Sequence, residues 1–293
     1  MTTPRPAQVP GLLLRLTGPL QSWGEHSHFN DRDTLPFPSR SALTGLLAAA
    51  LGRQRHHSLD DLNLSITVRA DRPGNHLRDF HTVGGGLAGD RTVVTADGKR
   101  RDSDTSTLTS TRWYLQDAAF TVALTLPDHA QPPTAWANAL QFPRWPLYLG
   151  RRSCPPAGPL LLGRSTDALH DLFHLPLALP APRTAATHGN DSEHGTIPVL
   201  FLSDQPLIGL SVPTNHTGSD SDAGQEHSTV LDVPVDFASR HRRYRVRPLY
   251  RRTLALPTSH CAGYGTDQLA KLAAYTSPTF TPAAHLAPEG SIQ

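Results

Sequence analysis

The chain of 293 residues is 38% hydrophobic, so it is long enough for one large domain or two ordinary ones and apolar enough to form a core. No apolar run approaches the roughly 18 residues of a membrane-spanning helix, and residues 1–11 lack the apolar region of a secretory signal. The two cysteines, Cys154 and Cys261, exclude a disulfide scaffold and a four-cysteine zinc site, so we expect reduced thiols in a cytoplasmic protein without membrane contact.

The formal net charge of +2 conceals a segregation of charge along the chain. Residues 167–236 hold ten acidic side chains and one arginine, a net charge of −9, so the other residues carry +11. Seven arginines follow within residues 240–252, and smaller basic groups lie at 99–101 and 151–152. Guanidinium groups suit phosphate contacts and stacking on bases. The pattern therefore predicts basic surfaces that follow a phosphate backbone, unless the acidic and basic stretches pair with each other.

The N-terminal part predicts a strand, a loop, a helix and a second strand. Residues 12–16 form a short apolar run typical of a buried strand, and residues 18–24 are rich in turn formers. Ser39 is a suitable N-cap for a helix whose apolar residues between 42 and 51 recur at helical spacing. Residues 64–69 alternate as in a half-buried strand.

The following part predicts a long protruding hairpin over about residues 78–115, with a polar centre that has no apolar period. Residues 120–126 form the clearest strand, a helix follows over 132–140, and residues 147–149 give a last strand. This order is the β-α-β-β-α-β arrangement of a ferredoxin-like (RRM-like) domain, with its middle hairpin extended.

Beyond residue 165 the patterns weaken, but β-strands still predominate. We expect an α+β fold with a ferredoxin-like RNA-binding domain over residues 1–165, a β-rich region with acidic flexible loops over 166–256, and a Pro/Ala-rich tail over 257–293. Short strands are expected in the β-rich region at residues 197–202, 206–212, 230–235 and 244–246.

Catalytic and cofactor motifs are weak. Sixteen histidines include His170 and His174 at helical spacing, but no cysteine pair or HExxH motif accompanies them, so we expect no metal and no other cofactor. His81 and Tyr114 lie on the two arms of the hairpin and are candidates for the acid and base of a ribonuclease. Packing of His81 between its apolar neighbours is the alternative.

Nucleic-acid binding has broader support. Arginines alternate with aromatic residues at 112–114, 144–145 and 243–245, a combination that binds phosphates and stacks on unpaired bases. Residues 150–153 (GRRS) offer backbone N–H groups, two guanidiniums and a hydroxyl in one turn, which is a compact anion site.

Segments in a fixed order over residues 11–247 resemble the type I-E branch of the Cas-five family, in the RAMP superfamily of CRISPR proteins. The resemblance rests on LLRLTGPLQSWG at 13–24, FPSRS at 37–41, LRDFHTV at 77–83, RWYL at 112–115, YLGRRSCP at 148–155 and DFASR at 236–240. It implies a noncatalytic subunit of the Cascade surveillance complex in antiviral defence, one copy per complex, which binds the 5′ handle of the CRISPR RNA (crRNA) and caps that end.

The resemblance also implies partners. The hairpin would be a thumb that holds the handle and meets a CasC-type backbone subunit; a CasA-type large subunit would be the second protein partner, and target DNA would be met only through the complex. Some relatives cut precursor RNA, so a metal-independent endoribonuclease acting on CRISPR repeat RNA remains an alternative, as does a scaffold that touches only proteins.

The expected RNA-binding residues come from the loop after the first strand, the start of the first helix, the hairpin and the 150–154 turn. They are Gln21, Ser22, Trp23, Arg40, Arg78, His81, Arg112, Trp113, Gly150, Arg151, Arg152, Ser153 and Cys154. We expect phosphate contacts from four of them, Arg40, Arg112, Arg151 and Arg152, and we expect the two tryptophans to stack on bases or to pack within the fold.

Overall fold

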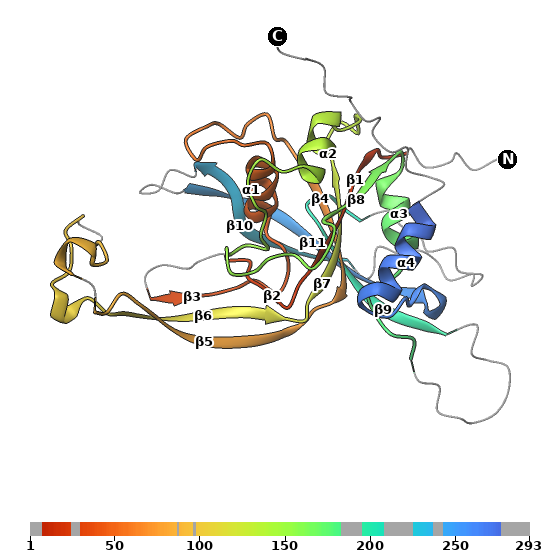
Figure 1. Cartoon of the computed structure of the whole chain (residues 1–293). Coiled ribbons are helices and arrows are strands. Elements are labelled where there is room, and N and C mark those ends of the chain that lie inside the picture. Colours follow the sequence, from red (N-terminus) through yellow and green to blue (C-terminus); the bar gives the residue numbers. More distant parts are fainter. Residues whose placement is uncertain are drawn as a thin grey trace, which may run out of the picture.

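The computed structural model describes residues 8–276 except 25–29, 87, 96–97, 183–194, 208–224 and 237–242. Its strands form a large and a small sheet (Figure 1). The large sheet is antiparallel and has the order β10 (Glu226–Asp236), β11 (Arg243–Pro257), β9 (Thr196–Ser203), β4 (Ser65–Arg72), β7 (Ala119–Thr125), β1 (Gly11–Thr17) and β8 (Leu161–Ser165). The small sheet contains β2 (Leu20–Gln21), β3 (Asp31–Arg32), β5 (Asn75–Val83) and β6 (Leu108–Gln116).

The α-helices of the described residues cover the two faces of the large sheet (Figure 1). α1 (Arg40–Ala50) and α2 (Thr134–Gln141) pack on one face, and α3 (Ala168–His174) and α4 (Gly265–Thr276) pack on the other. None of these helices is both long and apolar enough to span a membrane, within the part of the chain that the structure describes.

Strand β1 shows why the N-terminal sequence is a continuous apolar run. Leu12, Leu14 and Leu16 join the cluster under α1 and α2, whereas Leu13 joins the cluster under α3 and α4. Successive side chains of a strand point to opposite faces. A strand covered on both faces therefore needs apolar residues at consecutive positions, as this sequence predicts.

The fourth strand of the predicted set lies elsewhere than expected. Residues 147–149 are irregular, because the N–H of Leu149 donates to the carbonyl of Cys154 (2.7 Å) and closes a turn. The strand that pairs with β1 on this side is β8, which follows the prolines of residues 155–159. Around β1 the spatial order is thus β4-β7-β1-β8.

The later strands continue the same sheet, because β9 pairs with β4. Strands β10 and β11 are longer than predicted, and the strand predicted at 206–212 lies mostly outside the described residues. Residues 257–276 also differ from the expected tail. They contain α4, whose Gln268 accepts a hydrogen bond from Nε of the buried Arg15 on β1 (3.0 Å).

Arg69 and Asp71 form a buried ion pair within β4, and Arg69 also links this strand to the end of α3. Nε of Arg69 donates to Asp71 Oδ1 (2.7 Å), and the side chains are 0% and 1% exposed. Nη1 of Arg69 also donates to the carbonyls of Leu172 (2.6 Å) and Leu175 (2.7 Å). Among the described residues, Asp71 is the acidic side chain that forms an ion pair with Arg69 and compensates its charge.

We expect Asp71→Ala to lower the free energy of unfolding by about 3–5 kcal/mol, because it leaves the guanidinium of Arg69 buried and unpaired. Denaturation in urea measures this change. The control is Asp61→Ala, which removes an exposed ion pair to Arg53 and should cost no more than about 1 kcal/mol. If both variants lose the same free energy of unfolding, burial does not determine how much the Arg69–Asp71 pair contributes to stability.

Candidate nucleic-acid interface at the root of the hairpin

Strands β5 and β6 form a hairpin that projects from the body of the molecule (Figure 1). Ser22, directly after β2, links its root to the turn of residues 149–154. The N–H of Ser22 donates to the carbonyl of Leu149 (3.1 Å), and its Oγ donates to the carbonyl of Trp113 on β6 (3.1 Å). Ser22 therefore holds the turn and the root of the hairpin together.

The turn requires glycine at position 150. Gly150 has a φ of +87°, in the left-handed region that favours glycine. A Cβ on Gly150 would lie 1.7 Å from the carbonyl oxygen of Ser22, which is far inside any contact distance. The absence of a side chain here lets the two backbone segments touch.

This close approach carries Arg151 onto the hairpin. Its Cζ lies 4.8 Å from the ring centroid of Tyr114, and its Nη2 donates to the carbonyls of Arg32 (3.0 Å) and Asp33 (3.3 Å). Its Nη1 is buried, and no hydrogen-bond partner for it lies among the described residues. Arg151 thus has an unused donor beside the root of the hairpin.

Strand alternation divides the hairpin into two faces, because directly paired residues share a face. The pairs Asp79–Arg112 and Leu77–Tyr114 lie on the same face, and β3 adds Arg32 beside Arg112. We call the surface formed by Arg32, Arg112, Tyr114 and Arg151 the arginine face. It brings guanidiniums from three separate segments together, which suits the phosphates of a single nucleic-acid strand.

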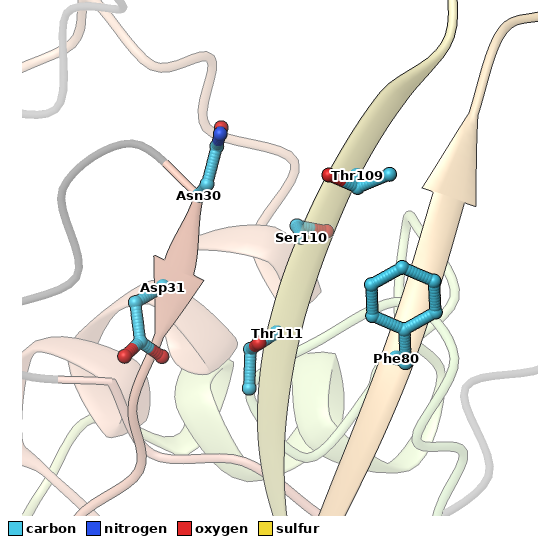
Figure 2. Close-up of a pocket in the computed structure, with 6 residues that line it drawn as sticks. All are labelled: Asn30, Asp31, Phe80, Thr109, Ser110 and Thr111. Atoms are coloured by element: carbon cyan, nitrogen blue, oxygen red, sulfur yellow. The ribbon is translucent and has the colours of Figure 1, made fainter.

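The opposite surface, formed by His76, Arg78, Phe80 and Trp113, is the tryptophan face. Arg78 pairs in register with Trp113, and the ring of His76 meets that of Trp113 edge to face at 6.3 Å. Phe80 is 71% exposed and lines a shallow hollow of about 180 Å³ (Figure 2). Arg78 and Trp113 therefore do not belong to the same surface as Arg112, although the sequence predicts all three as RNA-binding residues.

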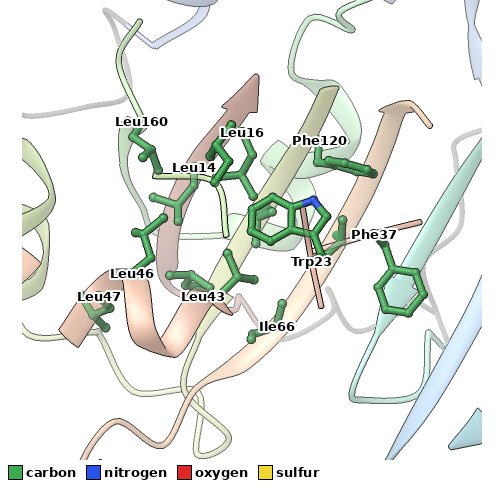
Figure 3. Packing of buried hydrophobic residues seen from close by; sticks show 14 of the residues in the cluster. Leu14, Leu16, Trp23, Phe37, Leu43, Leu46, Leu47, Ile66, Phe120 and Leu160 are labelled. Atoms are coloured by element: carbon green, nitrogen blue, oxygen red, sulfur yellow. The ribbon is translucent and has the colours of Figure 1, made fainter. Parts of the chain in front are cut away.

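Four predicted RNA-binding side chains are enclosed by the fold. Gln21, Ser22, Trp23 and Cys154 are at most 2% exposed. The ring of Trp23 packs among core residues such as Leu16 (Figure 3), and its Nε1 donates to Gln21 Oε1 (3.2 Å). These side chains support the interface from inside, so the prediction that they contact RNA is corrected.

Cys154 and Arg40 are also accounted for by the fold. Burial raises the pKa of the Cys154 thiol, which keeps it protonated and unreactive at neutral pH. Arg40 forms an ion pair with Asp204, and its backbone N–H donates to the carboxylate of Asp232 (2.6 Å). The same carboxylate accepts a hydrogen bond from Nε of Arg247 (2.7 Å). For Arg247 the predicted pairing of the basic with the acidic stretch is correct. Arg40 lies outside the basic stretches but is also paired with an acidic residue, so its predicted phosphate contact is not supported.

The proposed acid–base pair does not come together. His81 is opposite Ser110 and Tyr114 is opposite Leu77, so they lie four residues apart, about 13 Å along the strands. Tyr114 is 5% exposed under Arg151, whereas His81 Nδ1 lies 3.5 Å from Asp79 Oδ2. This geometry offers no shared site for proton transfer.

The remaining turn residues, Arg152 and Ser153, are exposed beside Arg151 and remain available to a ligand. Arg32 and Asp33, whose carbonyls bind Arg151, are not among the residues predicted from the sequence. Their positions result from a two-residue strand, β3, that pairs with β6 in parallel, and no periodic pattern marks so short an element.

Comparison with known proteins places the chain in a family. The family described as "CRISPR-associated protein (Cas_Cas5)" matches residues 11–250. The chain therefore belongs to the Cas5 family of CRISPR-associated proteins. It is 41% identical to the "CRISPR system Cascade subunit CasD" of Escherichia coli (strain K12) over 165 residues, which are 52% of this chain and 70% of that protein. The resemblance to the type I-E branch is thereby confirmed.

Two solved structures of CRISPR-associated proteins are also similar to this chain. A chain of a "CRISPR RNA-guided surveillance complex" matches with a TM-score of 0.71 and 40% identity, over 91% of this chain and 99% of that chain. A "Crystal structure of Cas protein" matches with a TM-score of 0.52 and 29% identity, over 87% and 99% of the respective chains.

We expect Gly150→Ala to lower the free energy of unfolding by at least about 2 kcal/mol, because the new Cβ adds a backbone clash to the cost of a positive φ. Thermal unfolding measures the loss. Gly86→Ala is the matched control, since Gly86 also has a positive φ but open space around the Cβ position. Similar losses would mean that the approach to Ser22 is unimportant.

Proposed function

We propose that this chain is the noncatalytic subunit of a type I-E Cascade surveillance complex that binds the 5′ handle of the crRNA and caps that end of the complex. Membership of the Cas5 family and similarity to a Cascade subunit support this proposal. The observation that carries it is the arginine face, where Arg112 and Arg151 come together at the root of a projecting hairpin.

In this proposal the hairpin is the thumb, and the strands β4-β7-β1-β8 with α1 and α2 are a ferredoxin-like RAMP domain. The handle lies on the arginine face, with Arg152 and Ser153 at its border. A CasC-type backbone subunit and a CasA-type large subunit are the protein partners. Target DNA is met through the assembled complex, one copy of the chain serves each complex, and the complex acts in the cytoplasm.

RNA binding should depend strongly on salt. The probe is the RNA that co-purifies with the tagged protein, whose 5′ ends we expect to begin with one common sequence. We expect Arg112→Ala and Arg151→Ala each to weaken its binding, and each to reduce the slope of log affinity against log salt by about 0.7, because each removes one phosphate contact.

Fluorescence anisotropy measures both quantities. Arg164→Ala is the control, because Arg164 lies on β8 at the edge of the large sheet and donates to the carbonyl of Pro132 (3.3 Å). If Arg112→Ala and Arg151→Ala behave like Arg164→Ala, the handle is bound elsewhere.

The purified chain should leave CRISPR repeat RNA intact in the presence of a metal chelator, because His81 and Tyr114 are too far apart to act on one phosphate. Gel electrophoresis of end-labelled repeat RNA tests this expectation. Cleavage at one site that is lost in His81→Ala would instead establish the endoribonuclease alternative.

A further inference from the structure

An exposed segment follows α2 and takes no part in the surfaces described above. Residues 141–146 are all exposed, and they include two large aromatic side chains, Phe142 (73%) and Trp145 (40%). Arg144 lies between them. We call residues 142–145 the aromatic strip. Aromatic residues and arginine are enriched at the surfaces where proteins bind their partners.

The aromatic strip is fixed against the C-terminal end of α1. The N–H of Arg144 donates to the carbonyl of Ala50 (2.9 Å), and its side-chain carbons pack over Gly52. Arg55 is exposed on the loop that follows, while Arg53 is paired with Asp61. The strip thus presents two rings and an arginine on a supported backbone, and a second exposed arginine, Arg55, follows Gly52 by three residues.

A short stretch of chain joins the strip to the arginine face. Arg151 follows Trp145 by six positions in the chain, so the two are at most about 22 Å apart. Between them, Leu149 is anchored on Ser22 at the hairpin root. In Figure 1 the green connection after α2 runs past α1 towards the small sheet. A strand leaving the arginine face along this segment would reach the strip.

We infer that the aromatic strip is a further subsite for single-stranded RNA, in which bases stack on Phe142 and Trp145 and Arg144 contacts a phosphate. This inference rests on the proposed function, because the RNA reaches the strip from the arginine face. Charge favours RNA over an apolar protein segment, since the exposed Arg144 stands between the two aromatic residues in the sequence. Stacking on aromatic rings is tolerant of sequence, so binding at this subsite depends on the length of the strand and not on the identity of its bases.

The test uses the full chain and fluorescein-labelled oligoadenylate RNA of increasing length, followed by anisotropy. Trp145→Ala should raise Kd at least about fivefold for strands long enough to reach the strip, and leave Kd unchanged for the shortest strands that bind. Trp145→Phe should restore most of the affinity. Arg144→Ala should reduce the salt slope by about 0.7, whereas Trp145→Ala should leave that slope unchanged. Thermal unfolding of each variant confirms that the fold is intact.

The outcomes separate this inference from the proposed function. If Trp145→Ala binds every length like the unmodified chain while Arg151→Ala weakens all lengths, the arginine face binds RNA and the strip does not. If only Trp145→Ala weakens binding, the strip binds RNA and the assignment of the arginine face fails. Normal RNA binding by Trp145→Ala with loss of co-purifying Cascade subunits overturns the inference and makes the strip a protein surface.

Discussion

The position of the candidate interface depends on the close contact between Gly150 and the carbonyl of Ser22. Ser22 holds the turn through its N–H and the hairpin through its hydroxyl, so two segments distant in sequence are fixed at one point. Arg151 follows Gly150 directly and is therefore placed over Tyr114 by the backbone. A side chain at position 150 would separate the turn from the hairpin and remove Arg151 from the surface on which it meets Arg112.

Arginine content alone does not reveal this interface. Arg15 and Arg69 are buried in the large sheet, where carbonyl, amide and carboxylate oxygens accept their hydrogen bonds. Arg40 and Arg247 are paired with Asp204 and Asp232. Such side chains stabilise the fold only while their partners remain, because an unpaired guanidinium in the interior costs several kcal/mol. A surface that binds phosphates needs arginines that are at least partly exposed and not paired with carboxylates among the described residues, such as Arg112, Arg151 and Arg152, and only the three-dimensional arrangement distinguishes the two kinds.

The sequence predicts the elements whose periodicity is strong, and it fails where long-range pairing decides. The two-sided apolar run of β1, the helix after Ser39 and the strand β7 are confirmed, since each needs only local information. The fourth strand is misplaced because residues 147–149 are apolar enough for a strand but close a turn instead. The local sequence does not predict that Trp23 and Gln21 are buried, because a segment rich in glycine and proline is typical of an exposed loop.

The run of Arg112, Trp113 and Tyr114 shows how the structure changes the meaning of a motif. In sequence the three residues form one basic aromatic group, but in a strand Trp113 points away from its two neighbours. Arg112 and Tyr114 consequently join Arg151 on the arginine face, and Trp113 joins Arg78 and the exposed Phe80 on the tryptophan face. A ligand on one face leaves the other open. A projecting hairpin with two chemically different faces is therefore suited to hold a nucleic-acid strand on one side while a second component of an assembly contacts the other.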